Sequence, residues 1–216
     1  MDPKQKFYNK RGDLLVTTLR SRHYEAYYCE TKEEALAKAL ELIPKGASVG
    51  WGGAMSAKQI GLLDAVNHGH YLAIDRDKAP NPEARKQAMK DCLLTDVFIT
   101  GANALSMDGQ MVNIDGNGNR VAAIVYGPEN ILVIAGMNKV MDTLEAAVIR
   151  ARTIAAPMNK QRFDLQTPCE VTGTCGDCKS ESCICNQILI TRNSKPAGRK
   201  PAGRIKMILV GEDLGF

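Results

Sequence analysis

Long hydrophobic runs are missing from this chain of 216 residues. No apolar stretch approaches the roughly 20 residues that a membrane-spanning helix requires, so we do not expect a membrane span. The first residues, MDPKQKFYNKRGD, lack the apolar core of a secretory signal, and we therefore expect a cytoplasmic protein. Hydrophobic residues make up 44% and charged residues 24% of the chain, a balance typical of a globular protein with a buried core.

Histidine is scarce, and a nucleophilic triad is missing as well. The three histidines, His23, His68 and His70, do not form a ligand pair with any cysteine by spacing. No serine, histidine and aspartate can be combined into a triad from the sequence. The sequence alone therefore leaves open whether the protein is an enzyme.

Residues 1–191 carry no net charge. From Arg192 onward there are six basic and two acidic residues, and this segment accounts for the whole net charge of +4. A basic run can mark a nucleic-acid interface, but a solvated basic loop is the more common interpretation. We therefore do not expect nucleic-acid binding.

Short apolar runs alternate with helix-like segments over the first 160 residues. This alternation predicts a doubly wound α/β fold with a mainly parallel sheet. We expect strands at 23–29, 47–50, 71–74, 95–100 and 130–135, and helices at 3–21, 31–43, 57–67, 83–92, 121–125 and 142–155, the last ended by Pro157. Residues 104–106 and 111–114 are expected to form a hairpin around Asp108-Gly109, and residues 188–190 and 205–210 a second hairpin with a long loop.

The glycine-rich stretch Val49–Ser56 is the feature around which the chain is organised. Glycines between a strand and a helix let the backbone approach a ligand, and free N–H groups at the helix start favour an anion. In a parallel sheet, ligands lie beyond the carboxyl ends of the strands, where loops 50–56, 101–103 and 136–138 fall and loop 115–120 could join them. The predicted ligand-binding residues are Gly50, Gly52, Gly53, Ser56, Gly101, Asn103, Asn113, Asp115, Asn117, Gly136 and Asn138.

Simpler explanations exist for several of these residues. The glycines could serve only as tight connections, and Ser56 could only cap the following helix. Asp108 and Asp115 could act as general bases, although Asp-Gly is a standard turn pair. Lys58 and Lys139 follow glycine turns and could neutralise a bound phosphate or carboxylate, or could simply be solvated.

Five of the seven cysteines fall in one short segment, whereas Cys29 and Cys92 stand alone. In a cytosolic chain such density suggests metal or redox chemistry before a disulfide scaffold. Four thiolates can close a zinc site or hold an iron–sulfur cluster, and we take Cys169, Cys175, Cys178 and Cys185 as the ligands, with Cys183 spare. Reduced thiols, a redox disulfide or a structural disulfide are the alternatives. The basic loop that follows repeats Lys-Pro-Ala-Gly-Arg at 195–199 and 200–204, and we expect it to be mobile.

Several motifs together resemble the lactate-utilisation (LUD) domain family. They are Val112-Asn-Ile-Asp-Gly-Asn-Gly-Asn-Arg-Val-Ala-Ala, Ile134-Ala-Gly-Met-Asn-Lys139, Ala155-Ala-Pro-Met-Asn159 and the ending Ile208-Leu-Val-Gly-Glu-Asp-Leu-Gly-Phe216. The cysteine segment is similar to a cysteine-bearing branch of that family. The resemblance covers nearly the whole chain, and we therefore expect one domain over 1–216, with 164–216 as its extension.

The resemblance implies the NagB/RpiA/coenzyme A transferase-like fold, shared with sugar-phosphate isomerases. Some LUD proteins are subunits of a lactate-oxidising complex with iron–sulfur partners. The resemblance thus implies a role in the use of lactate or a related hydroxy acid, with a small anionic ligand at the glycine loops. The alternatives are a stand-alone sugar-phosphate isomerase or acyl- or coenzyme A-transfer enzyme, and a metal- or redox-responsive binding module. Homo-oligomer formation is left open.

Overall fold

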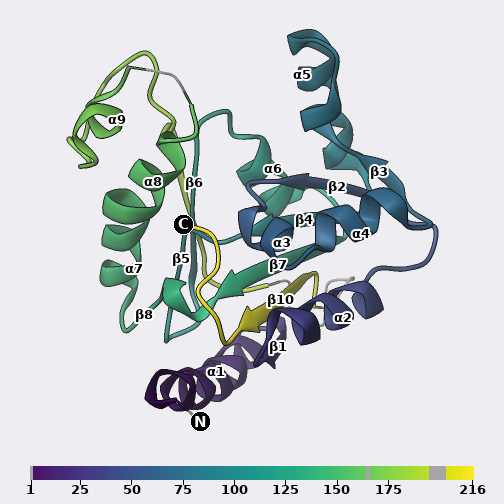
Figure 1. The fold of residues 1–216 in the computed structure, drawn as a ribbon, viewed down its shortest axis with the longest axis vertical. Coiled ribbons are helices and arrows are strands. Elements are labelled where there is room, and N and C mark those ends of the chain that lie inside the picture. The colour runs from purple at the N-terminus through teal and green to yellow at the C-terminus, as the bar shows by residue number, and fades with distance from the viewer. Residues whose placement is uncertain (1, 164–165, 195–202) are drawn as a thin grey trace.

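A six-stranded, all-parallel sheet forms the centre of the computed structural model, which describes residues 2–163, 166–194 and 203–216 (Figure 1). Its strand order is β1-β10-β7-β4-β2-β3. The strands are β1 (Glu25–Cys29), β2 (Ser48–Gly52), β3 (Leu72–Ile74), β4 (Val97–Gly101), β7 (Asn130–Gly136) and β10 (Ile205–Val210). The predicted doubly wound α/β fold with a mainly parallel sheet is confirmed.

Strand β7 shows why this sheet is covered on both faces. Its Ile131 and Val133 belong to one buried cluster, and its Leu132 and Ile134 to another, because successive side chains point to opposite faces. The first cluster includes residues of α1 (Pro3–Ser21) and α6 (Asn119–Tyr126). The second includes residues of α2 (Lys32–Leu42), α3 (Met55–Gln59) and α4 (Leu62–His68).

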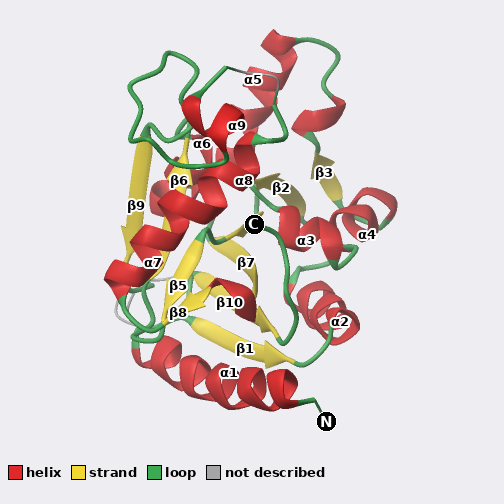
Figure 2. Cartoon of the chain, turned by 60° about the vertical axis from the view of Figure 1, so that its left-hand side comes forward, coloured by secondary structure: helices red, strands yellow, loops and turns green. Residues whose placement is uncertain are grey.

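A second, smaller sheet stands beside the first, and Figure 2 shows the helical segment that begins with α7 in front of it. It has the order β8-β5-β6-β9, with β5 (Ala104–Ser106), β6 (Met111–Asp115), β8 (Val140–Met141) and β9 (Gln187–Thr191). Small alanines of the helical segment pack against this sheet. The predicted β5–β6 hairpin is confirmed, with Leu105 opposite Met111.

The remaining described helices lie between β3 and β4 of the large sheet or between β8 and β9 of the small sheet. They are α5 (Pro82–Asp91), α7 (Leu144–Arg150), α8 (Ala156–Lys160) and α9 (Pro168–Thr172), with 3₁₀ turns at Arg76–Lys78, Cys92–Leu94 and Met137–Lys139. The capping role predicted for Thr31 is confirmed, because its hydroxyl accepts from the Glu34 backbone N–H at 3.2 Å. Among the described helices, none is long and apolar enough to cross a bilayer.

The predicted hairpin between 188–190 and 205–210 is wrong. Strand β9 pairs with β6 in the small sheet, with Ile190 opposite Val112, whereas β10 lies between β1 and β7 in the large sheet. The burial pattern explains this separation. Four consecutive residues of β10, from Met207 to Val210, are fully buried, as expected of a central parallel strand. Ile188 and Ile190 remain partly exposed on β9, the edge strand.

Two predicted helices also differ from the structure. The helix expected over 57–67 is two helices, α3 and α4, separated at Gly61, whose φ of +80° is a left-handed conformation that glycine adopts readily. The helix expected to end at Pro157 continues to Lys160. A π-helical segment at Ala151–Ala155 links α7 to α8. Pro157 therefore lies inside a continuous helical run, and the π-helical segment directly precedes the point where its missing N–H interrupts the helical hydrogen bonds.

Most of the basic loop lies outside the described residues. The expected mobility of residues 195–202 therefore stays a prediction.

Candidate functional site

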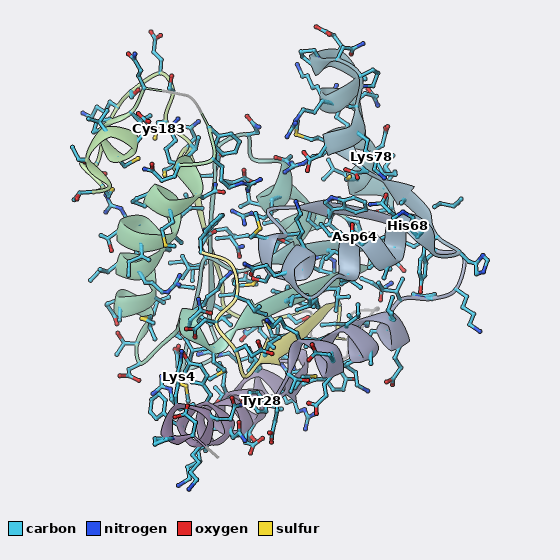
Figure 3. The ribbon with its side chains drawn as sticks, in the orientation of Figure 1. Lys4, Tyr28, Asp64, His68, Lys78 and Cys183 are labelled. Atoms are coloured by element: carbon cyan, nitrogen blue, oxygen red, sulfur yellow. The ribbon has the colours of Figure 1, made fainter. Side chains whose placement is uncertain are left out.

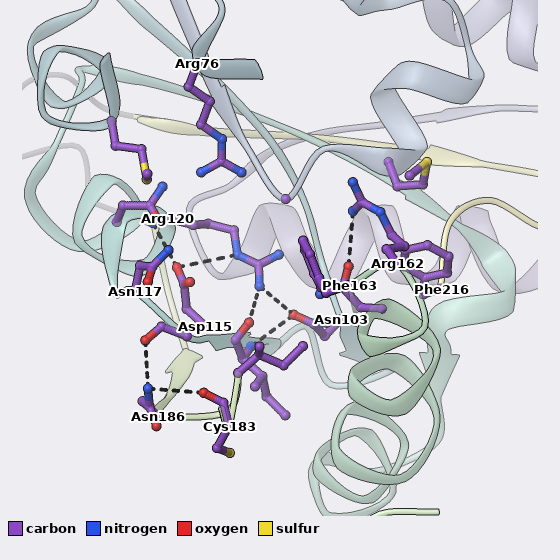
Figure 4. A pocket seen from close by; sticks show the side chains of 18 of the residues that line it. Arg76, Asn103, Asp115, Asn117, Arg120, Arg162, Phe163, Cys183, Asn186 and Phe216 are labelled. Atoms are coloured by element: carbon purple, nitrogen blue, oxygen red, sulfur yellow. Dashed lines mark hydrogen bonds and ion pairs between the residues drawn. The ribbon is translucent and has the colours of Figure 1, made fainter. Parts of the chain in front are cut away.

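A cavity of about 530 Å³ opens at the carboxyl ends of β2 and β4 (Figure 4). These neighbouring strands send their connections to opposite faces of the sheet, since β2 leads into α3 and β4 leads through the small sheet to α6. Such a switch point leaves a crevice that open α/β sheets use for ligands. Gly53, Ala102 and Asn103 line the cavity from these two strand ends.

Gly53 forms the turn after β2 with a φ of +59°. Its carbonyl accepts from the Gly101 backbone N–H at 3.2 Å, which joins the two loops. A Cβ atom at Gly53 would overlap the guanidinium of Arg120. The glycine is therefore required by both its backbone conformation and the close approach of Arg120.

Replacing Gly53 with alanine is expected to lower the free energy of unfolding by about 1–3 kcal/mol, because the substitution adds backbone strain and displaces Arg120. Gly46→Ala is a matched control: Gly46 also has a positive φ, of +76°, but nothing lies within 4 Å of its added Cβ. Urea denaturation of both variants separates the two contributions. Equal losses for the two variants would contradict a close packing of Arg120 on Gly53.

Arg120 lies at the centre of the cavity floor, and Figure 4 shows its guanidinium between Asp115 and Asn103. It donates to the side-chain oxygen of Asn103 at 3.1 Å and to the carbonyl of Ile114. Asp115 lies 4.0 Å away, but its carboxylate also accepts the backbone N–H groups of Arg120 and Val121 at 2.9 and 3.2 Å. Asp115 thus caps α6, in line with its interpretation as a turn residue.

Lys139 is a second buried cationic residue on the cavity wall and is 4% exposed. Its Nζ donates to the hydroxyl of Ser56 and to the carbonyl of Ala102, both at 3.0 Å. Burial, together with smaller effects of the positive charges of Arg150 and Arg120, lowers the pKa of Lys139 to about 7. Near neutral pH the amine is therefore poised between its charged and neutral forms.

Three further arginines, Arg76, Arg85 and Arg162, line the upper part of the cavity. Arg76 points into it in Figure 4, and its buried Nε has no hydrogen-bond partner among the described residues. Asp77, the acidic residue nearby, pairs with Arg85 at 2.9 Å and lies 4.0 Å from Arg76. The cavity therefore carries five cationic and three acidic side chains, and two of the acids already have partners.

The structure brings some of the predicted ligand-binding residues to this cavity and leaves others beneath it. Gly53, Asn103, Asp115 and Asn117 line it. The others lie outside its lining, in strands β2, β4, β6 and β7, in α3 and in the 3₁₀ turn after β7: Gly50, Gly52, Ser56, Gly101, Asn113, Gly136 and Asn138. For example, Asn113 donates from its amide nitrogen to the Gly101 carbonyl at 3.0 Å. Ligand binding by these residues stays a prediction.

The arginines in and around the cavity were not predicted from the sequence as site residues. Arg150 does not line the cavity, but it donates to the backbone carbonyls of Asn103 and Asn138 and so ties the loops after β4 and β7 together. A lone arginine has no diagnostic spacing, and Arg76, Arg150 and Arg162 carried no signal. Arg120 ends the glycine loop 115–120 and could have been included with it.

The cysteine segment forms a separate cavity of about 260 Å³, which all five clustered cysteines line. Cys183 and Ile184 line both cavities, so the two are neighbours. Burial raises the pKa of the Cys185 thiol to about 12, and neighbouring Cys183 adds to this effect. Within the described part of the chain, no three His, Cys, Asp or Glu side chains stand close enough to hold a metal ion, and all seven cysteines are free thiols.

The family model described as LUD domain matches residues 13–210 of this chain. A DUF162 family protein from Deinococcus radiodurans resembles the structure with a TM-score of 0.52 and 12% identity, over 94% of this chain and 98% of that one. Among the curated proteins, no match was found.

Two ribose 5-phosphate isomerases A match more weakly, over 52% of this chain. The Neisseria gonorrhoeae enzyme has a TM-score of 0.34 and 19% identity over 54% of its own chain. The Methanocaldococcus jannaschii enzyme has a TM-score of 0.35 and 18% identity over 55% of its own chain. The family match confirms the LUD-domain resemblance, and the Deinococcus structure shares the fold of this chain.

Proposed function

Because the chain belongs to the LUD domain family, we propose that it binds a small organic anion in the strand-end cavity and serves the use of lactate or a related hydroxy acid. Three buried or nearly buried cationic side chains, Arg76, Arg120 and Lys139, converge on this cavity without a matching set of free carboxylates. This observation carries the proposal.

A buried positive charge is expensive unless an anion or hydrogen-bond acceptors compensate it. Arg120 has acceptors, but Arg76 keeps an unpartnered Nε, and the pKa of Lys139 falls to about 7. A carboxylate or phosphate in the cavity would add counter-charge where five cationic side chains face only three acidic ones.

The size of the cavity allows more than one class of anion. Ligand sites commonly measure about 300–1,000 Å³, so a cavity of about 530 Å³ accommodates a hydroxy acid with water, or a larger phosphate ester. A hydroxy acid is the ligand class that the family resemblance favours. Association with iron–sulfur subunits of a lactate-oxidising complex is part of the same proposal.

Thermal denaturation of the full chain tests the binding. The ligands tested are lactate, ribose 5-phosphate and coenzyme A. We expect at least one of them, and lactate first, to raise Tm above its value in sodium chloride of equal ionic strength. At a ligand concentration 100 times Kd, the stabilisation is about 2.7 kcal/mol. Failure of every organic anion to exceed the salt control would overturn the proposal, and a response to ribose 5-phosphate or coenzyme A alone would overturn its hydroxy-acid part.

A charge-removing variant ties the binding to the cavity. Arg76→Gln is expected to weaken the anion's affinity about tenfold, or about 1.4 kcal/mol. The change leaves Asp77 paired with Arg85. Lys10→Gln removes one positive charge from an exposed position of α1 that does not line the cavity, and it should leave Kd unchanged. Calorimetry on the two variants measures both values, and equal losses would point to bulk charge rather than to this site.

A further inference from the structure

The cavity of the cysteine segment contains a buried cation without a counter-ion. Lys160 is fully buried, lines this cavity, and has no hydrogen-bond partner for its Nζ within the described residues. An isolated buried ammonium costs several kcal/mol unless something compensates its charge. The cavity that Lys160 lines is therefore the place where a compensating negative group would bind.

The protein groups around Lys160 do not supply that charge. Asp177 is the carboxylate of the cavity lining, and it pairs with Arg152, which lines the cavity from the same helical segment as Lys160. The remaining polar groups are mainly thiols, which are neutral when protonated. Thiolates bound to a metal would instead carry negative charge: four thiolates around zinc, or around an iron–sulfur core, leave a net negative centre.

The elements of the fold hold these groups together. The helical segment of α7, the π-helical turn and α8 presents Arg152, Ala156 and Lys160 at intervals of four residues, and so on one side. The cysteine segment covers this side from α9 to β9. Cys183 marks this part of the molecule in Figure 3, at the end opposite Lys4. The thiols thus share one cavity, although they are not yet gathered around a common point.

The spread of the thiols distinguishes between the two kinds of metal centre. The five thiols line the cavity of about 260 Å³ together with nine other residues, and no three of these described thiols stand close enough to hold a single ion. A single zinc ion draws four sulfur atoms to about 2.3 Å. A polynuclear iron–sulfur core spans more widely separated thiolates, and this arrangement therefore favours it over one ion.

We propose that this cavity holds an iron–sulfur cluster bound by Cys169, Cys175, Cys178 and Cys185, with Lys160 as its buried counter-charge. Binding releases the four thiol protons to solvent as the thiolates coordinate iron, and the thiols themselves are not oxidised. Cys183 is left out because it lies in the wall between the two cavities and accepts a hydrogen bond from the Cys185 backbone N–H at 3.4 Å.

Anaerobic loading of the full chain tests the cluster. The protein is incubated with sulfide and equal amounts of ferrous and ferric iron, so that assembly of a four-iron core needs no further oxidant, and is then desalted. We expect iron and acid-labile sulfide in equal amounts, with visible sulfur-to-iron absorption. Cys178→Ser should lose both, whereas Cys183→Ser, the matched control, should keep them. Absence of bound iron, or equal losses in the two variants, would overturn the site.

Parallel loading with zinc alone separates the metals. Zinc that binds at one ion per chain and cannot be replaced by iron and sulfide would overturn the iron–sulfur assignment. Weak zinc binding that iron and sulfide displace would support it.

Lys160→Met tests the counter-charge. Loss of the Lys160 ammonium should destabilise the reduced cluster, which is more negative than the oxidised one. We expect the one-electron reduction potential to fall by at least about 59 mV, which corresponds to a tenfold change in the equilibrium constant. The metal-free variant should be no less stable than the wild type, because an uncompensated charge has been removed. An unchanged potential would overturn the role of Lys160.

Discussion

Replacing Arg204 with methionine is expected to lower the free energy of unfolding by about 3 kcal/mol. Arg204 is 5% exposed and lies just before β10. Its guanidinium donates to the carbonyls of Pro128 and Ala123, both at 2.8 Å, and to that of Ile124. These carbonyls lie at the end of α6 and just beyond it, where helices leave many acceptors unpaired, although that of Ala123 also accepts the Gly127 backbone N–H at 3.0 Å. Methionine fills much of the volume but donates no hydrogen bond to them.

Arg192→Met is the matched control for this prediction. Arg192 is exposed and follows β9, so its loss should change stability by less than about 0.5 kcal/mol. Urea denaturation of both variants provides the comparison. A similar small effect of Arg204→Met would show that water or other donors satisfy the three carbonyls, and that Arg204 does not fasten β10 to α6.

Lys139→Met is expected to remove a rise in stability with pH that the wild type shows. The pKa of Lys139 is lowered from 10.5 to about 7 in the folded protein, chiefly by burial. Between these values the unfolded chain binds more protons at this site than the folded chain does, so this lysine makes stability increase with pH. Each pH unit contributes about 1.4 kcal/mol, or about 3 kcal/mol between pH 7.5 and pH 9.5.

The measurement is a series of urea denaturation curves across this pH range. The difference in stability between the wild type and Lys139→Met isolates Lys139, because contributions from other lysines are common to both proteins. Lys58→Met, at an exposed position of α3, should keep the wild-type slope. Parallel pH profiles of the wild type and Lys139→Met would mean that Lys139 is not desolvated as its burial indicates.

The fold could be predicted from the sequence where local pattern and tertiary packing agree. Thr31 fixes the start of α2 by accepting the Glu34 backbone N–H, and the apolar run 130–135 has the length and composition of a buried strand. The pairing of β9 and β10 could not be predicted in this way. Both runs are apolar and both lie near the end of the chain, but their partners are β6 and β7, and such long-range choices depend on burial of the whole strand.

The same distinction between local and long-range signals applies to the candidate site. Glycine and asparagine loops mark strand ends locally, and this is why Gly53, Asn103, Asp115 and Asn117 reach the cavity as expected. Arg76 and Arg162 come from elements far apart in sequence, so only the folded chain brings their charges together. The proposed metal ligands are intermediate: the clustering of the cysteines is visible in the sequence, whereas the burial of Lys160 beside them is not.

The position of β10 sets the order in which the large sheet can be completed during synthesis. Strand β1 pairs only with β10 in the described sheet, and Glu25 lies opposite Lys206. Until residues 205–210 have left the ribosome, β1 therefore waits without a partner, and β7 presents an unpaired edge. Pairings so distant in sequence make folding slow, and the open edge can recruit other chains meanwhile. The nascent protein therefore passes through its most aggregation-prone stage just before its last strand inserts.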